Sequence, residues 1–209
     1  MQNGVAFVPL QLPGRENRFT EPLPTSYAEL SADIFSVLER YVDLPLGVFG
    51  HCGSALAAYE TVARFDEAGV AEMPQLFVSS EVAPQDGPYS PLLAMSRAEL
   101  HDFLAGMLVE MGSRVHESLL DVALDILESD LAMNARYLQP SRPLVSATLT
   151  AIGWTRDDGI EPWRMTGWEQ CGNTRSWTLE GDHYAFTHAP RPLLDLIGSR
   201  MFEALDGSV

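Results

Sequence analysis

The chain has 209 residues, 46% of them hydrophobic, which is enough to bury one good core, so we expect a single domain spanning residues 1–209. Its formal net charge is −16 and all 13 basic residues are arginine, which argues against nucleic acid as a partner because phosphate contacts need a basic surface. No apolar run is long enough to span a bilayer and the start lacks a secretory signal pattern, so we expect a soluble cytoplasmic protein with no membrane partner.

The first elements are expected before residue 42. A short apolar run, Val5–Leu10, predicts a strand, and a turn and loop follow it. Ser26 is a suitable N-cap, with Glu29 three places on as its capping-box partner, so a helix is predicted over Tyr27–Tyr41. Its apolar face comprises Leu30, Ile34, Val37, Leu38 and Tyr41.

The next stretch predicts a nucleophile elbow, in which a reactive side chain sits on a strained turn between a strand and a helix. Leu46–Phe49 is typical of a buried strand, and an Ala/Leu-rich helix follows. The residues two before and two after the apex must be small, which Gly50 and Ser54 satisfy if Cys52 is the apex. With Ser54 at the apex, Leu56 would be too bulky. The alternative is a buried structural cysteine beside a glycine-rich turn.

A strand over Pro74–Ser80 precedes a long helical region from Ser96 to about Tyr137 that is rich in Leu, Met and Ala. Its apolar side chains exceed what one buried stripe requires. We interpret residues of approximately 90–138 as a helical lid inserted between strands, with its inner face lining an acyl channel. The alternative is an ordinary core-packing helix pair.

The remaining chain alternates strands with helical segments. Strands are predicted over Pro143–Gly153 and Arg175–Leu179, with a polar loop from Trp154 to Gly159 and a short helix over Pro162–Trp168 between them. A tight turn and a terminal helix beginning at Pro192 follow. Alternation of this kind predicts an α/β fold with a mostly parallel sheet flanked by helices.

A nucleophile after one strand, an acid after a later strand and a histidine in the last loop is the chain order of an α/β-hydrolase triad. We predict Cys52 as nucleophile, His183 as base and Asp157 as the acid that orients the imidazole. The backbone N–H of Gly53 would be one oxyanion donor. Asp158 and His188 are the alternatives for acid and base, and no Cys/His spacing suggests a metal site.

Several segments together resemble the type II thioesterases that work beside polyketide and nonribosomal peptide synthases. Gly50-His51-Cys52 is similar to the Gly-His-Ser of that family, with cysteine in place of the nucleophilic serine. The other matching segments are Gln11–Phe19, Leu76–Ser79 with Ala83-Pro84, Gly153–Asp157 with one glycine replaced by Trp154, and Gly181-Asp182-His183. The similarity covers essentially the whole chain in the right order.

The resemblance implies a single α/β-hydrolase domain with a mobile lid and no cofactor of its own. It implies hydrolysis or transfer of acyl or peptidyl groups presented on the phosphopantetheine of a carrier protein or synthase module. The family's opening strand and oxyanion loop have no counterpart here, so the domain is N-terminally shortened. Either the start is truncated, or a partner supplies that segment, or oxyanion stabilisation is weakened. The rival function is an inactive or non-covalent relative that binds an acyl chain or a synthase partner, or guides cyclisation.

Overall fold

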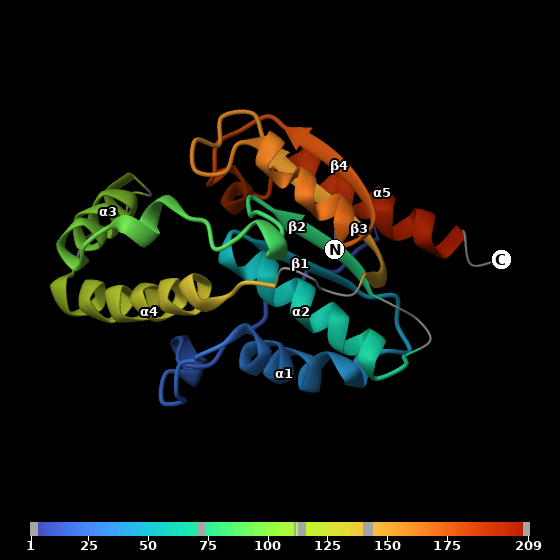
Figure 1. Ribbon diagram of the computed structural model, residues 1–209, viewed down its shortest axis with the longest axis horizontal. Helices are drawn as coiled ribbons and strands as arrows, with labels where there is room; N and C mark the ends of the chain where they lie inside the picture. Colours follow the sequence, from blue (N-terminus) through green and yellow to red (C-terminus); the bar gives the residue numbers. More distant parts are fainter. Residues whose placement is uncertain (1–3, 71–73, 111, 113–115, 140–143, 207–209) are drawn as a thin grey trace.

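The computed structural model describes residues 4–70, 74–110, 112, 116–139 and 144–206 (Figure 1). At its centre is a parallel sheet in the order β1-β2-β3-β4. The strands are β1 (Gly47–His51), β2 (Gln75–Ser79), β3 (Val145–Trp154) and β4 (Gly172–Leu179). Because all four strands run in the same direction, their carboxyl ends lie at the same edge of the sheet, at the ends of the strands. The loops that bear functional residues gather there.

Helices cover both faces of this sheet. Neighbouring residues of β2 point to opposite sides, as the pleat requires: Leu76 packs with residues of α1 (Tyr27–Leu38) and α2 (Gly53–Glu67), whereas Phe77 packs with α5 (Arg191–Asp206). Strands buried on both faces explain the continuous apolar runs in the sequence. The predicted parallel α/β sheet is therefore confirmed.

The N-terminal predictions are only partly correct. The strand expected over Val5–Leu10 is wrong, because Val5 makes a single bridge and residues 6–10 have no regular structure. The predicted helix is present as α1, continued by a 3-10 turn over Glu39–Tyr41. Its cap is also correct, since the Ser26 side chain accepts from the backbone N–H of Glu29. At the end of the expected apolar face, however, Val37 and Tyr41 are exposed.

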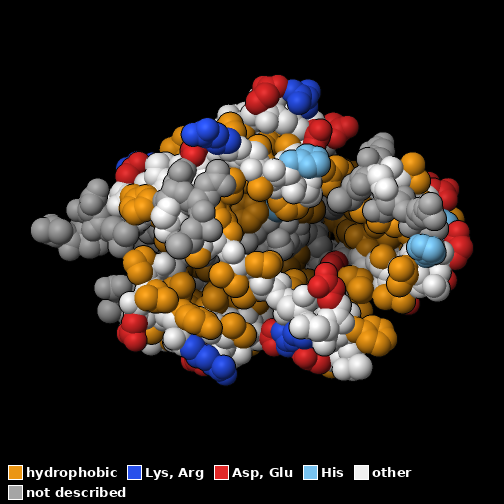
Figure 2. Space-filling view, turned by 180° about the vertical axis from the view of Figure 1, so that it is seen from behind, with side chains coloured by type: hydrophobic (Ala, Val, Ile, Leu, Met, Phe, Trp, Pro, Cys, Tyr) orange, Lys and Arg blue, Asp and Glu red, His pale blue; other side chains and the backbone are white. Residues whose placement is uncertain are grey.

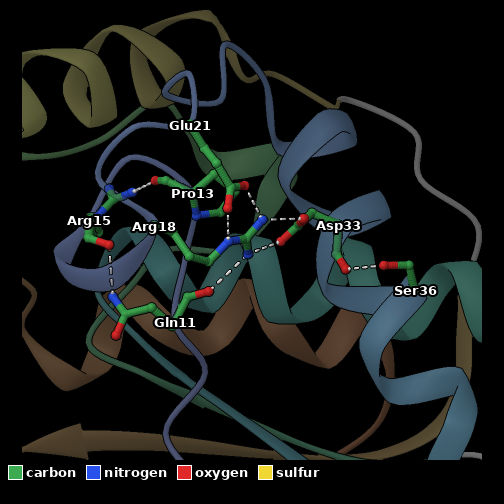
Figure 3. A network of polar contacts seen from close by, with 7 residues as sticks. All are labelled: Gln11, Pro13, Arg15, Arg18, Glu21, Asp33 and Ser36. Atoms are coloured by element: carbon green, nitrogen blue, oxygen red, sulfur yellow. Dashed lines mark hydrogen bonds and ion pairs between the residues drawn. The ribbon is translucent and has the colours of Figure 1, made fainter.

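A loop held by arginines precedes α1 (Figure 3). Arg18 donates to both carboxylate oxygens of Asp33 on α1, at 2.8 Å each, and to Glu21. Arg15 donates to Asp130 of α4 (Glu117–Arg136) at 2.6 Å and to the carbonyl of Pro13. These contacts fix the loop against α1 and α4, two helices that are far apart from each other in the sequence.

The predicted helical insertion consists of α3 (Arg97–Glu110) and α4, which lie beside the sheet rather than across it (Figure 1). The pair has a core cluster of its own, formed by Leu100, Leu104, Leu120 and Leu124. Hydrophobic side chains also reach the surface of this lobe, at the right of Figure 2; Val109 and Leu119 are among the exposed ones. The end of α4 joins the main core through Met133. Among the described residues, every helix is too short or too polar to cross a membrane.

Two differences concern the last strands. Trp154, expected in a polar loop, is the last residue of β3 and its side chain is fully buried. β4 starts three residues earlier than predicted, at Gly172. Pro143, the expected start of β3, lies outside the described residues. The predicted short helix is a 3-10 helix over Pro162–Gln170.

Candidate active site

Cys52 occupies the sharp turn between β1 and α2. Its backbone has φ 52° and ψ −142°, a conformation that L-residues rarely adopt and that is typical of a strained functional turn. The Cys52 N–H donates to the carbonyl of Ser79 at the end of β2, at 2.8 Å, which holds the turn over the carboxyl edge of the sheet. The side chain is partly exposed.

The neighbours of Cys52 are small because the backbone leaves no room. A Cβ atom on Gly50 would lie 2.3 Å from the carbonyl oxygen of Ser54 and 2.6 Å from the Cα of Ala55. The Ser54 hydroxyl accepts from the His51 N–H at 2.9 Å and donates to the His51 carbonyl at 2.7 Å. Ser54 therefore serves the turn itself, which argues against it as the apex.

His183 and Asp157 lie together at the same edge. The Nδ1 atom of His183 is 3.1 Å from each carboxylate oxygen of Asp157. Asp157 is buried, and its Oδ1 accepts from the backbone N–H of Gly159 at 3.1 Å and of Ile160 at 2.9 Å. Burial alone would raise the pKa of Asp157, but the hydrogen bonds from His183 and Ile160 help to lower it below its usual value. The acid is thus held ionised behind the imidazole.

The structure brings Cys52 to the other side of the same imidazole. Burial acts to lower the pKa of His183, but hydrogen-bonding interactions with Asp157 and with Cys52 outweigh it and raise that pKa to about 10. The carboxylate on one side of the imidazole and the sulfur on the other both favour the protonated ring. The three predicted residues are therefore adjacent, in the order Cys52, His183, Asp157.

The alternatives from the sequence do not join this cluster. Asp158 is exposed, although it is next to Asp157. His188 is exposed at the end of a 3-10 helix that follows His183. Asp182 accepts from the N–H of Tyr184 at 3.0 Å, as a turn residue does.

A second histidine, His51, packs against His183. His51 is buried, stacks on Phe186 at 3.9 Å between ring centres and contacts His183 edge to face at 4.7 Å. Ser79 Oγ accepts from Trp154 Nε1 at 3.0 Å, so its single proton is available to His51 Nδ1, also 3.0 Å away. Burial, and then the charge of His183, lower the pKa of His51 to about 3. His51 is therefore a neutral packing residue at neutral pH.

Glu81 is an acid near the site that we did not single out in the sequence. Its side chain is 1% exposed, and Oε1 accepts from the N–H of Val82 at 2.9 Å. Burial raises the pKa of Glu81 to about 8, although the Val82 N–H and the charge of His183 oppose this shift. Its position two residues after a buried strand, at the carboxyl end of a parallel sheet, is the signal that could have found it.

The protonation of Glu81 predicts a pH-dependent stability. The folded pKa lies above the ordinary value of 4.5, so stability from this group is complete below pH 4.5 and is lost as the pH rises through about 8. Glu81→Gln removes the ionisation and is expected to unfold less readily than the wild type at pH 8, by a free energy on the order of 3 kcal/mol. Urea unfolding at pH 5 and pH 8 measures this. The control is Asp158→Asn, a substitution of the exposed residue next to Asp157. An equal pH dependence in wild type and Glu81→Gln would contradict the prediction.

Within the described part of the chain, no three His, Cys, Asp or Glu side chains are grouped so as to hold a metal ion. The residues that do gather are the groups of acyl transfer: a sulfur, an imidazole and a carboxylate, beside the N-terminus of a helix whose first residue is Gly53.

A family model described as a thioesterase domain matches residues 1–198. The protein belongs to the thioesterase family. The chain is 28% identical over 214 residues to the linear gramicidin dehydrogenase LgrE of Brevibacillus parabrevis, covering 97% of this chain and 80% of that protein. It is 29% identical over 191 residues to the phenyloxazoline synthase MbtB of Mycobacterium tuberculosis, covering 87% of this chain but only 13% of that protein.

Solved structures agree with this assignment. The type II thioesterase BorB from the borrelidin biosynthetic cluster superposes with a TM-score of 0.77 at 26% identity, covering 91% of this chain and 79% of that one. The α/β-hydrolase fold and the thioesterase family, both expected from the motifs, are confirmed. The thioesterase family is one of hydrolytic enzymes.

Proposed function

We propose that this protein hydrolyses or transfers acyl or peptidyl groups from the thioesters of carrier proteins in polyketide or nonribosomal peptide biosynthesis, through a triad of Cys52, His183 and Asp157. The observation that carries the proposal is the imidazole of His183, which contacts a buried carboxylate on one side and the sulfur at the elbow on the other. Similarity to the linear gramicidin dehydrogenase LgrE and to a type II thioesterase from the borrelidin biosynthetic cluster supports the biosynthetic setting.

The first half-reaction makes an acyl-enzyme. The Cys52 sulfur, as thiolate, attacks the carbonyl carbon of the carrier thioester and forms a new C–S bond. The carbonyl oxygen becomes an oxyanion, which the N–H of Gly53 stabilises. When the oxyanion collapses, the bond to the pantetheine sulfur breaks, and the imidazolium of His183 gives its proton to that leaving thiolate. Asp157 keeps the ring in the orientation for both transfers.

The second half-reaction differs from that of a serine enzyme. The acyl group on Cys52 is still a thioester, so an amine or alcohol acceptor competes with water for it. Neutral His183 takes the proton of the attacking nucleophile, the C–S bond to Cys52 breaks, and the thiolate returns. The site therefore catalyses acyl transfer or ring closure as well as hydrolysis.

Arginines on the surface are the residues whose charge would suit an acidic carrier protein. Three of them are Arg15, Arg18 and Arg97. All three are occupied within the chain: Arg15 pairs with Asp130, Arg18 with Asp33 and Glu21, and Arg97 with Asp125 and Glu128. An acidic carrier would have to compete with these carboxylates, so we do not assign the docking surface to them.

The helical insertion is proposed to act as the lid. Its core cluster is separate from the two clusters that lie against the sheet. Among the described residues, the pair of helices packs as a unit of its own and joins the main core through the last turns of α4, which suits an element that moves over an acyl chain.

The proposal is tested with a carrier protein loaded with a defined acyl group. Wild-type protein is mixed with it in water alone and with an added amine, and the released products are identified by mass spectrometry. We expect free acid in the first case and a mixture of acid and amide in the second. Tight binding of the acyl carrier without release would instead support the rival function, an inactive relative that binds acyl chains.

A further inference from the structure

The hydroxyl of Tyr27 is the feature of the site that the proposed mechanism leaves unused. Tyr27 is the first residue of α1, and the Ser26 cap fixes the start of that helix. The side chain is 2% exposed, and its ring packs edge to face against Tyr137 with centres 4.9 Å apart. The hydroxyl oxygen lies 3.2 Å from where a Cβ on Gly53 would be, so it stands over the residue directly after the nucleophile.

The surroundings of this phenol leave its proton free to be donated. The side-chain amide of Asn134 on α4 acts to lower the pKa of the hydroxyl, as a donor directed at the phenol oxygen does. Asn134 is itself 5% exposed, and its Oδ1 atom has no partner among the described residues. A phenol that accepts from an amide retains its own O–H for another acceptor.

The burial of Tyr27 keeps that proton in place. Burial is the largest cause that raises the pKa of Tyr27, which lies far above the usual value. Gly53, which the hydroxyl approaches, is the residue next to the reacting sulfur. A phenol of this kind is a neutral hydrogen-bond donor at any pH at which the enzyme works.

We propose that the Tyr27 hydroxyl is a second oxyanion donor that acts with the N–H of Gly53, a role that rests on the proposed covalent function of Cys52. Oxyanion sites work through preorganised donors aimed at the position where negative charge develops. A buried phenol held by the Ser26 cap, the Tyr137 ring and the Asn134 amide is preorganised in this sense. Tyr27 is then a catalytic residue, while Asn134 is a positioning residue that orients it.

The proposal predicts different effects of Tyr27 on two reactions of the Cys52 sulfur. Acylation of Cys52 by a thioester builds charge on a carbonyl oxygen, and loss of one oxyanion donor costs a factor of about 10²–10³ in such a step. Alkylation of Cys52 by iodoacetamide displaces iodide directly and builds no oxyanion. Removal of the Tyr27 hydroxyl should therefore slow the first reaction and leave the second unchanged.

The experiment measures both rates in wild type, Tyr27→Phe and Tyr137→Phe, using an N-acetylcysteamine acyl thioester, iodoacetamide and intact-protein mass. Tyr137→Phe is the matched control, because its ring is the neighbour of Tyr27 but its hydroxyl donates to Glu60 at 2.6 Å. We expect Tyr27→Phe to slow acylation by about 10²-fold with alkylation unchanged, and Tyr137→Phe to be acylated at near wild-type rate.

A second variant addresses the case in which Tyr27→Phe folds poorly. Gly53→Ala keeps the phenol but places a methyl group 3.2 Å from its oxygen, which displaces the hydroxyl. It should also slow acylation more than alkylation. Equal acylation of wild type and both variants would overturn the role of Tyr27 while leaving the covalent function intact. A wild type that alkylates but never acylates would overturn the covalent function itself, and the inference with it.

Discussion

His183→Gln is expected to lower kcat/KM for thioester turnover by about 10²–10⁴-fold, the range that a positioned general acid and base contributes. Glutamine retains a polar side chain but cannot take up and release the proton that both half-reactions pass through this ring. The loss should appear mainly in kcat, because carrier binding uses other surfaces. Steady-state release of free thiol from an acyl carrier measures it.

His188→Gln is the control for this substitution. His188 is exposed five residues further along the same loop, and its substitution removes a histidine without touching the site. Its turnover should match that of the wild type. If His188→Gln lost as much activity as His183→Gln, the assignment of the base would be wrong.

Gly50→Ala is expected to destabilise the fold by about 3 kcal/mol or more, a large share of the roughly 5–15 kcal/mol that holds a domain together. Its new Cβ would lie 2.3 Å from the carbonyl oxygen of Ser54 and 2.6 Å from the Cα of Ala55. Both are backbone atoms of the turn and the first turn of α2, so the elbow itself must open. Activity should be lost together with stability, because the turn sets the position of Cys52.

Gly106→Ala gives the matched comparison. Gly106 is in α3, and nothing lies within 4 Å of the Cβ it would acquire. Since alanine favours helix over glycine by about 0.5–1 kcal/mol, this variant should be as stable as the wild type or slightly more stable. Urea unfolding of the two variants compares them directly. A Gly50→Ala protein as stable as Gly106→Ala would contradict the close approach at the elbow.

The sequence predicted the elements whose pattern is local. The strand before Cys52 and the helix after it follow from an apolar run, small residues and an Ala/Leu-rich segment, and the cap at Ser26 follows from its spacing to Glu29. The motifs also selected His183 and Asp157 over their neighbours, since the order of a triad along the chain restricts the choice to a few loop positions.

The features that the sequence did not predict depend on distant parts of the chain. Val5–Leu10 has the composition of a strand but lacks the ladder that would make it one, because pairing is a tertiary property. Trp154 looked like a loop residue after Gly153, yet its ring fills the core and its Nε1 bonds Ser79 on the neighbouring strand. No local pattern marks Tyr27 as a neighbour of Gly53, because α1 and the elbow meet only in the folded chain.

The covalent role of Cys52 is tested most directly by the mass of the intact protein within seconds of mixing with an acyl-loaded carrier. The wild type is predicted to gain the mass of the acyl group, with the adduct on the peptide that contains Cys52 and none on Cys171, which is buried. Cys52→Ala should gain nothing and release no acyl product. Full turnover by Cys52→Ala, or an acyl group found on another residue of the wild type, would contradict the proposed mechanism.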